Sequence, residues 1–236
     1  MHKLFSPVIG VIIICLGLSF AGCDSEKKKQ KEPVVSEGIV KYRISYDQQT
    51  KNRSFSFLLP DQMEFFFRPG EERISFQGNM GVYALDFISD HESDSSTTLL
   101  KIFDNKMYVP PSESEGLFIF HALRNGEVIL QEDSLRGIMG YEARKAIVRH
   151  PEKNDANIDV WYTPEISSGK TNKNTPFSQI PGVMLEFAIY YNGVWFSLKP
   201  ESIEKAEHSD SVFEIPEGYR RTSINEIEKM VAELLK

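Results

Sequence analysis

Along most of the chain, apolar and polar residues alternate with a period of two. Val40, Tyr42 and Ile44, for example, alternate with Lys41 and Arg43. This period is typical of a strand with one face in the core and one face in water. The same alternation returns over residues 55–59, 63–67, 74–76, 83–87, 97–103, 107–109, 143–148 and 158–162. The sequence therefore predicts a mainly β protein with a single antiparallel, strongly curved sheet, either a half-barrel or an open barrel.

The clearest local signal is Asn192-Gly193, which separates the apolar runs 183–191 and 194–199. Asn-Gly favours a two-residue type I′ hairpin turn, because both turn positions need a positive φ. On the outward face this turn places Glu186 opposite Lys199, a favourable cross-strand pair. On the other face it pairs Phe187 with Leu198, Ile189 with Phe196, and Tyr191 with Val194. These six side chains, the hairpin face, are our candidate surface for an apolar ligand; the alternative is that the core of the domain buries them.

Helix signals are scarce. Ser223 and Glu226 have the spacing of a capping box, and an apolar stripe follows at helical spacing, so we expect a C-terminal amphipathic helix packed on the sheet. The stripe consists of Ile224, Ile227, Met230, Val231 and Leu234. One more short helix is predicted over residues 112–123, where a strand is the alternative.

The N-terminal segment resembles a bacterial lipoprotein signal. Residues 1–22 begin with the positive Lys3, continue with an apolar run, and end in Ala21-Gly22 before Cys23. This order is typical of a secretory signal, and Ala21-Gly22-Cys23 resembles a lipobox, which implies cleavage before Cys23 and lipid attachment to it. The alternative is an uncleaved membrane anchor, which the short run and its Pro7 disfavour.

Residues 23–36 hold the lipidated Cys and a polar segment with almost nothing to bury, which predicts a flexible tether. Residues 37–236 contain no linker and no internal repeat, and we expect them to form a single β-rich domain. The predicted location is the bacterial cell envelope, with the lipid anchor in the outer membrane. The residues leave open whether the domain faces the periplasm or the cell surface.

Composition excludes several classes of partner and chemistry. The chain of 236 residues has a formal net charge of −7, whereas nucleic-acid-binding domains normally carry a basic face, so no nucleic-acid partner is expected. Cys15 and Cys23 are the two cysteines. Cleavage of residues 1–22 would leave Cys23 alone, which excludes an intramolecular disulfide, and its lipid would exclude it as a nucleophile.

No catalytic, cofactor or metal-binding motif is present. Four histidines follow the signal segment without ligand spacing and are predicted to lie at the surface: His91, His121, His150 and His208. Asp90, Glu92 and Asp94 alternate like the start of a calcium loop, but Ser95 occupies the position of its glycine, which favours a simple acidic hairpin loop. Four aromatic residues suit either sugar stacking or ordinary packing on strands, namely Trp161, Tyr162, Tyr190 and Trp195.

Several segments resemble the GLPGLI-like families of Bacteroidota envelope lipoproteins, and they follow the family's order over residues 37–222. They are Glu37-Gly-Ile-Val-Lys-Tyr, Ile138-Met-Gly-Tyr-Glu-Ala-Arg-Lys-Ala, Val160-Trp-Tyr-Thr-Pro-Glu-Ile, Ile180-Pro-Gly-Val-Met-Leu-Glu and Phe213-Glu-Ile-Pro-Glu-Gly-Tyr. The resemblance implies an envelope lipoprotein and brings no catalytic residues with it. At the level of fold, the predicted plan is also similar to periplasmic lipoprotein carriers, whose curved sheet holds acyl chains.

Three functions fit these observations. The prediction is a non-enzymatic, membrane-tethered interaction module in a cell-envelope assembly, which needs an exposed apolar patch for a protein partner. The alternative is a carrier that binds a lipid or another apolar ligand on the concave face of the sheet. The least favoured function is a hydrolase whose site is assembled from dispersed residues.

Overall fold

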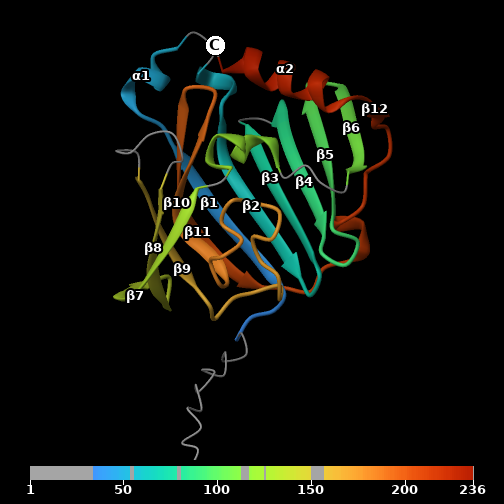
Figure 1. Cartoon of the computed structure of the whole chain (residues 1–236). Helices are drawn as coiled ribbons and strands as arrows, with labels where there is room; N and C mark the ends of the chain where they lie inside the picture. Colours follow the sequence, from blue (N-terminus) through green and yellow to red (C-terminus); the bar gives the residue numbers. More distant parts are fainter. Residues whose placement is uncertain are drawn as a thin grey trace, which may run out of the picture. The chain divides into compact units, whose positions relative to one another are not determined.

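The segments with a period of two pair edge to edge into one twelve-stranded sheet (Figure 1). The computed structural model describes residues 34–53, 56–78, 81–112, 117–124, 126–149 and 157–235, all of which belong to the unit Glu32–Lys236. The predicted signal, Cys23 and nearly all of the tether lie outside the described residues. The strands are β1 (Gly38–Ser45), β2 (Pro60–Arg68), β3 (Glu71–Gly78), β4 (Tyr83–Asp90), β5 (Ser95–Ile102), β6 (Asn105–Ser112), β7 (Glu127–Ile138), β8 (Tyr141–Arg149), β9 (Asn157–Thr163), β10 (Val183–Tyr191), β11 (Val194–Lys205) and β12 (Arg220–Arg221).

The strand order is β12-β6-β5-β4-β3-β2-β1-β11-β10-β9-β8-β7. Every neighbouring pair is antiparallel except β12 with β6. The edge strands β12 and β7 do not pair with each other, so the sheet stays open. The predicted mainly β, largely antiparallel architecture is confirmed.

The Asn192-Gly193 hairpin has the predicted register. Phe187 pairs with Leu198, Ile189 with Phe196, and Tyr191 with Val194. Asn192 and Gly193 have φ values of 48° and 79°, as a type I′ turn requires. Glu186 differs from the expectation, because its carboxylate lies 2.7 Å from Arg136 Nη2 on β7 and forms its ion pair there rather than with Lys199.

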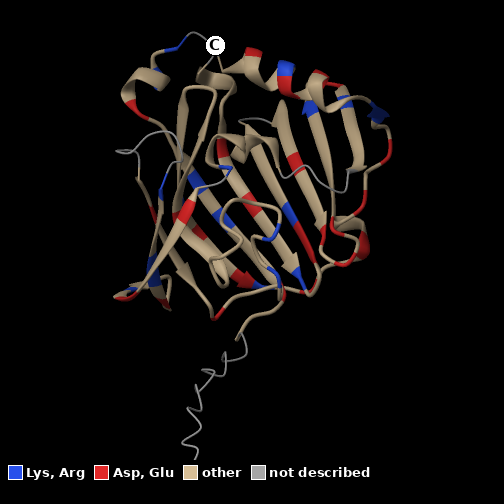
Figure 2. Cartoon of the chain, in the orientation of Figure 1, with Lys and Arg blue, Asp and Glu red and all other residues tan. Residues whose placement is uncertain are grey.

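The helical elements are short. They are α1 (Gln48–Lys51), the 3₁₀ helices η1 (Ser56–Leu58), η3 (Phe118–Leu123) and η4 (Asp210–Val212), and α2 (Ile224–Leu234). The predicted C-terminal helix is confirmed as α2, and the Ser223 hydroxyl accepts a hydrogen bond from the Glu226 amide at 3.3 Å. Three acidic residues and one basic residue lie along α2 (Figure 2), namely Glu226, Glu228, Glu233 and Lys229.

Two local predictions need correction. The predicted strand over residues 55–59 is wrong: Ser56–Leu58 form η1, and Phe57 is 66% exposed. The Leu59 amide bonds the Ser56 carbonyl and closes this turn, which leads the chain from α1 into β2. Between residues 112 and 123 the short helix exists only as the 3₁₀ helix η3, whose four apolar side chains are buried. The expected capping residue Glu115 lies outside the described residues.

The main core lies on one side of the sheet, and the hairpin face belongs to that side. η3 and residues 164–182, the covering loop, pack on this face, and α2 lies across its upper end (Figure 1). Edge-to-face contacts between aromatic rings connect these layers. Phe118 packs against Phe87 and Tyr191, and Phe177 packs against Phe120 and Phe187. The sheet therefore carries a covered apolar face, not an open concave surface.

The opposite face of β3–β6 has a smaller apolar layer of its own. Phe213, from the segment after β11, packs there on Ile88 and Leu99. Arg73 and Asp86 form a largely buried ion pair of 3.2 Å in the same layer, and Arg73 Nη1 also donates to the Val212 carbonyl. This half of the sheet is covered on both sides.

Candidate functional site

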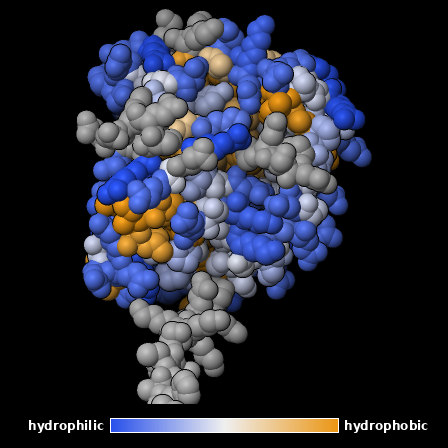
Figure 3. Space-filling view, in the orientation of Figure 1, coloured by the Kyte–Doolittle hydropathy of each residue, from blue (hydrophilic) through white to orange (hydrophobic). Residues whose placement is uncertain are grey.

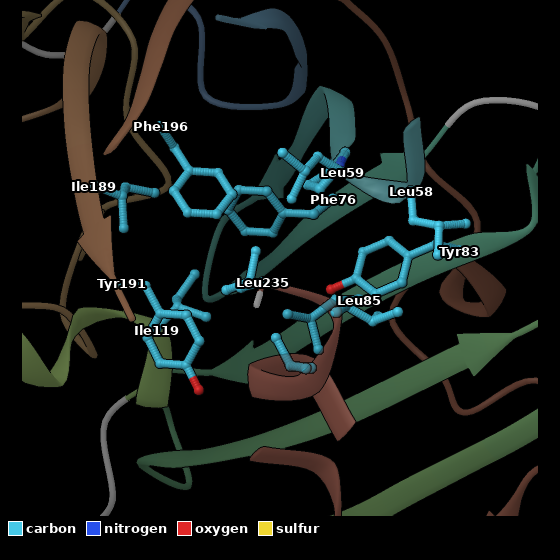
Figure 4. A pocket seen from close by; sticks show the side chains of 13 residues that line it. Leu58, Leu59, Phe76, Tyr83, Leu85, Ile119, Ile189, Tyr191, Phe196 and Leu235 are labelled. Atoms are coloured by element: carbon cyan, nitrogen blue, oxygen red, sulfur yellow. The ribbon is translucent and has the colours of Figure 1, made fainter. Parts of the chain in front are cut away.

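A small apolar cavity lies where α2 crosses the end of the sheet (Figure 4). Its volume is about 30 Å³, above the roughly 10–15 Å³ that a cavity needs to hold one water molecule. The lining comes from β2, β3, β4, η1, η3, β10, β11 and α2, and it includes Phe76, Leu85, Ile189, Phe196 and Val231. We call this space the first cavity.

The hairpin face reaches this cavity only in part. Ile189, Tyr191 and Phe196 line it. Phe187 lines a second space described below, and the remaining two members are fully packed in the core, with Val194 0% and Leu198 1% exposed. The structure thus divides the candidate surface between cavity lining and ordinary core.

α2 forms one wall of the first cavity. Val231, which is 4% exposed, lines this wall together with Leu234 and Leu235. Two polar contacts hold the end of this helix. Asn192 Nδ2 donates to the Ala232 carbonyl at 3.2 Å, and the Arg53 guanidinium donates to the Leu235 carbonyl. The Ala232 carbonyl also accepts the Leu235 amide at 3.3 Å, so these side-chain donors reinforce a helix end whose carbonyls have few partners within the helix.

Two tyrosine hydroxyls are the polar side-chain groups of the first cavity. Burial raises the pKa of Tyr83, and nearby Tyr191 and Asp86 raise it further. Burial and then Glu228 raise the pKa of Tyr191 to about 12. Both hydroxyls are therefore neutral at physiological pH, and the lining residues that the structure describes offer no charged group to a ligand.

The second cavity, also about 30 Å³, lies under the covering loop. Tyr42, Met63, Ile74 and Phe187 supply apolar lining from four strands, and Glu72 supplies a carboxylate. Glu72 is 6% exposed. A carboxylate buried to this degree is costly unless polar partners compensate it.

Two side chains contact Glu72. The Ser168 hydroxyl donates to Glu72 Oε1 at 2.5 Å, and His91 Nε2 lies 3.4 Å from Oε2. His91 is 2% exposed, and within the described part of the chain neither ring nitrogen has a hydrogen-bond partner. The predicted surface position of His91 is therefore wrong.

This cluster does not have the order of a hydrolytic triad. In such a triad the histidine contacts the nucleophilic hydroxyl and takes its proton. Here Glu72 stands between Ser168 and His91, and Ser168 is 4% exposed. The arrangement supplies a buried acceptor, not an activated nucleophile.

The covering loop is held in place by Asn172. Its side-chain amide donates to the carbonyls of Ile180 and Gly182, at 3.2 and 2.9 Å. Gly182 has a φ of 88°, and a Cβ there would lie 2.1 Å from the Thr163 carbonyl oxygen. Only glycine fits this position, which gives the Ile180-Pro-Gly-Val segment a structural reason.

The other candidate groups are placed as follows. Asp90 accepts hydrogen bonds from the Ser93 hydroxyl and the Glu92 amide, and these bonds lower its pKa. No cluster of three or more metal-ligating side chains occurs within the described ranges. Tyr162 is buried in the core, and the Arg136 guanidinium lies 4.2 Å from the centre of the Trp161 ring. Trp161 therefore has a cation, not an open ring face, on one side.

Reasoning from the sequence missed the Glu72 cluster. Its three members are separated by 19 and 77 residues, and they meet only because β3, the end of β4 and the covering loop converge. A weak hint was available in β3, where Glu72 shares the inward face with Ile74 and Phe76 under a period of two.

No protein-family model and no curated protein matches the sequence. The structure is similar to PNGF-II (13% identity, TM-score 0.49, 84% of this chain and 33% of that chain) and to LprF from Mycobacterium bovis (11%, 0.29, 75% and 89%). It is also similar to MucB in complex with MucA(peri) (7%, 0.31, 78% and 56%). This chain thus spans about a third of the PNGF-II chain. The resemblance to the GLPGLI-like families stays a prediction.

Within the ranges that the structure describes, no helix has the length and apolarity needed to cross a bilayer.

Proposed function

We propose that this protein is a non-enzymatic, lipid-anchored envelope protein that binds an apolar ligand in the first cavity, beneath α2. Cys23 is the proposed lipid attachment site after removal of residues 1–22, residues 23–36 are the proposed tether, and the outer membrane is the proposed location. The lipobox resemblance and the GLPGLI-like segments support the envelope part of this proposal. The first cavity carries the ligand-binding part.

The composition of the first cavity favours an apolar ligand. Thirteen of the described residues line it, and none of these is charged. Apolar pockets with a few polar groups at the edge are the usual sites for small hydrophobic molecules. Each buried methylene of a ligand contributes about 0.8 kcal/mol to binding, so even a short alkyl chain gains affinity there.

The cavity must widen to accept more than a methyl-sized group, and α2 is the wall best able to move. α2 belongs to no strand pairing, so its outward movement leaves the sheet intact. Its fully buried side chains are Ile227 and Val231, and the remaining stripe residues are half-buried. Elements with few buried contacts open at the lowest free-energy cost.

Filling the cavity tests this proposal. Ile189→Trp places a large ring in the first cavity, whereas Tyr190→Trp, the next residue of β10, changes the outward face. In the full chain carrying Cys23→Ser, we expect Ile189→Trp to weaken binding of the neutral fluorophore N-phenyl-1-naphthylamine by about tenfold or more. Tyr190→Trp should leave it unchanged. Equal affinity in both variants would refute ligand binding at this cavity.

One observation favours the interaction module as a second candidate. β7 is a twelve-residue edge strand, and unpaired edges accept an extended segment of a partner protein as an added strand. Leu135 on β7 is 55% exposed, and Met139, in the turn between β7 and β8, is 48% exposed. An apolar area is visible on the side where β7, β8 and β9 lie (Figure 3).

A photo-crosslinking residue distinguishes this second candidate. Introduced at Leu135 of β7, it should crosslink one envelope protein in intact cells. At Lys229, on the solvent side of α2, the same residue should not crosslink that protein. Crosslinking at neither position, or equally at both, would count against β7 as the partner site.

A further inference from the structure

The two cavities lie end to end along the same strands. On β3, Phe76 lines the first cavity while Ile74 and Glu72 line the second; on β10, Ile189 lines the first and Phe187 the second. Residues two apart on one strand face are about 7 Å apart. η3 contributes Ile119 to one cavity and Phe120 to the other. The two cavities therefore follow one another along the apolar face from α2 to Glu72, and we call this line the path.

Aromatic rings pack against one another around the Glu72 half of this path. Phe187 contacts Tyr42 at 5.7 Å and Phe177 at 6.3 Å between ring centres, and Phe120 contacts Phe177 at 5.6 Å. These rings come from two strands, η3 and the covering loop. Rotation of side chains, without a change in strand pairing, would join the halves.

The far end of the path differs chemically from the first cavity. Its polar side chains already donate hydrogen bonds to main-chain carbonyls. Tyr42 Oη donates to the carbonyl of Met184, Thr175 Oγ1 to that of Asn172, and Asn172 Nδ2 to those of Ile180 and Gly182. Glu72 has two carboxylate oxygens and, among the residues that the structure describes, accepts one hydrogen bond, from Ser168. What this end offers a ligand is therefore acceptor capacity and negative charge.

We propose that the second cavity recognises the head group of a single-chain amphiphile, that this head group is a hydrogen-bond donor such as a primary amine or a hydroxyl, and that Glu72 is its acceptor. The inference rests on the proposed function, because the alkyl chain would occupy the first cavity. A carboxylate head group fits poorly, since it brings a second negative charge next to Glu72.

Ser168 and His91 then act as positioning residues. The Ser168 hydroxyl fixes one oxygen of Glu72, and His91 faces the other. This arrangement also anchors the covering loop, so loss of stability alone cannot identify head-group recognition. The decisive readout is the preference among ligands that differ only in their head group.

The test compares dodecylamine, dodecanol and dodecanoate in the full chain carrying Cys23→Ser. Each competes for the protein with N-phenyl-1-naphthylamine at concentrations below micelle formation. We expect the amine to bind about tenfold or more tightly than the carboxylate, with the alcohol between them. Equal affinities, or a preference for dodecanoate, would overturn the inference while leaving the proposed function standing. Absence of any probe binding would overturn both.

Two variants assign the preference to its residue. Glu72→Gln should reduce the difference between amine and carboxylate to about threefold or less, while probe affinity is kept. Glu64→Gln is the matched control, since Glu64 contacts Gln77 on the opposite face of the neighbouring strand, and it should keep the wild-type preference. A preference that survives Glu72→Gln would refute the role of Glu72. If Glu72→Gln fails to fold, the relative affinities of the three ligands for the protein with Glu72 intact still test head-group recognition.

Discussion

The side-chain amide of Asn192 donates a hydrogen bond to the main-chain carbonyl of Ala232, at 3.2 Å. A residue that the hairpin turn requires for its positive φ thus also holds the end of α2. The wall of the first cavity is thereby tied to the tip of the hairpin that lines it. Opening of the cavity must break this bond.

Asn192→Gly isolates the contribution of the amide, because glycine keeps the turn conformation. We expect a loss of about 1 kcal/mol in the stability of α2 docking, measured as faster hydrogen exchange of the α2 amides. Exchange in β4 and β5 should stay unchanged. Asn192→Ala should destabilise further, since alanine is strained at a φ of 48°. Identical exchange in α2 before and after Asn192→Gly would show that the bond does not hold the helix.

Docking of α2 depends on Val231, which is 4% exposed. Val231→Asp buries an unpaired charge, and we expect a cost on the order of 3 kcal/mol, a fall of about 6–12 °C in Tm for a domain of this size. If the helix detaches instead, the fall is smaller and α2 amides lose their exchange protection. Lys229→Asp on the exposed side is the control. An unchanged Tm with unchanged exchange in Val231→Asp would contradict docking through this side chain.

Much of this architecture follows from local patterns. Two residues, Asn192 and Gly193, determine a turn and hence the register of ten neighbouring positions. The apolar stripe after Ser223 predicts α2. β7 escaped prediction because Gln131 to Ser134 interrupt its alternation, where the pairing with β8 shifts register. The turn at Ser56–Leu58 was not predicted, because Phe57 is apolar and fits the alternation of a strand, yet its side chain is exposed.

The candidate site could be predicted only in part. Alternation identifies the hairpin face as apolar, but it does not tell which segment covers that face. η3 and the covering loop do so, through contacts such as Phe118 with Tyr191 that join residues far apart in sequence. The meeting of Glu72, His91 and Ser168 likewise depends on long-range packing, which no local pattern encodes.

Alkaline pH should destabilise the fold through its buried tyrosines. Burial raises the pKa of Tyr42, Tyr46 and Tyr83 above the ordinary value near 10. The folded state therefore holds these protons more tightly than the unfolded state, so this stability is complete below pH 10 and is lost as the pH rises further. Absorbance at 295 nm and circular dichroism should show that these tyrosines ionise only as the protein unfolds. Ionisation of all nine tyrosines near pH 10 with the fold intact would contradict their burial.

Membrane attachment is predicted to depend on Cys23. Cys23→Ser should abolish labelling by a clickable fatty acid and move the protein from the membrane to the soluble fraction, because two or three acyl chains are what gives stable anchoring. Cys15→Ser, within the proposed signal, is the control and should label normally. Undiminished labelling of Cys23→Ser would refute the lipoprotein assignment.

The most direct measurement of ligand binding uses the ligand that the cell itself supplies. The full chain carrying Cys23→Ser, exported in its own host, is purified without detergent, extracted with organic solvent and analysed by mass spectrometry. We expect a single-chain amphiphile at near-stoichiometric amount, largely absent from the Ile189→Trp variant and retained by Tyr190→Trp. An extract without any such molecule, from a folded protein that also fails to bind N-phenyl-1-naphthylamine, would contradict it.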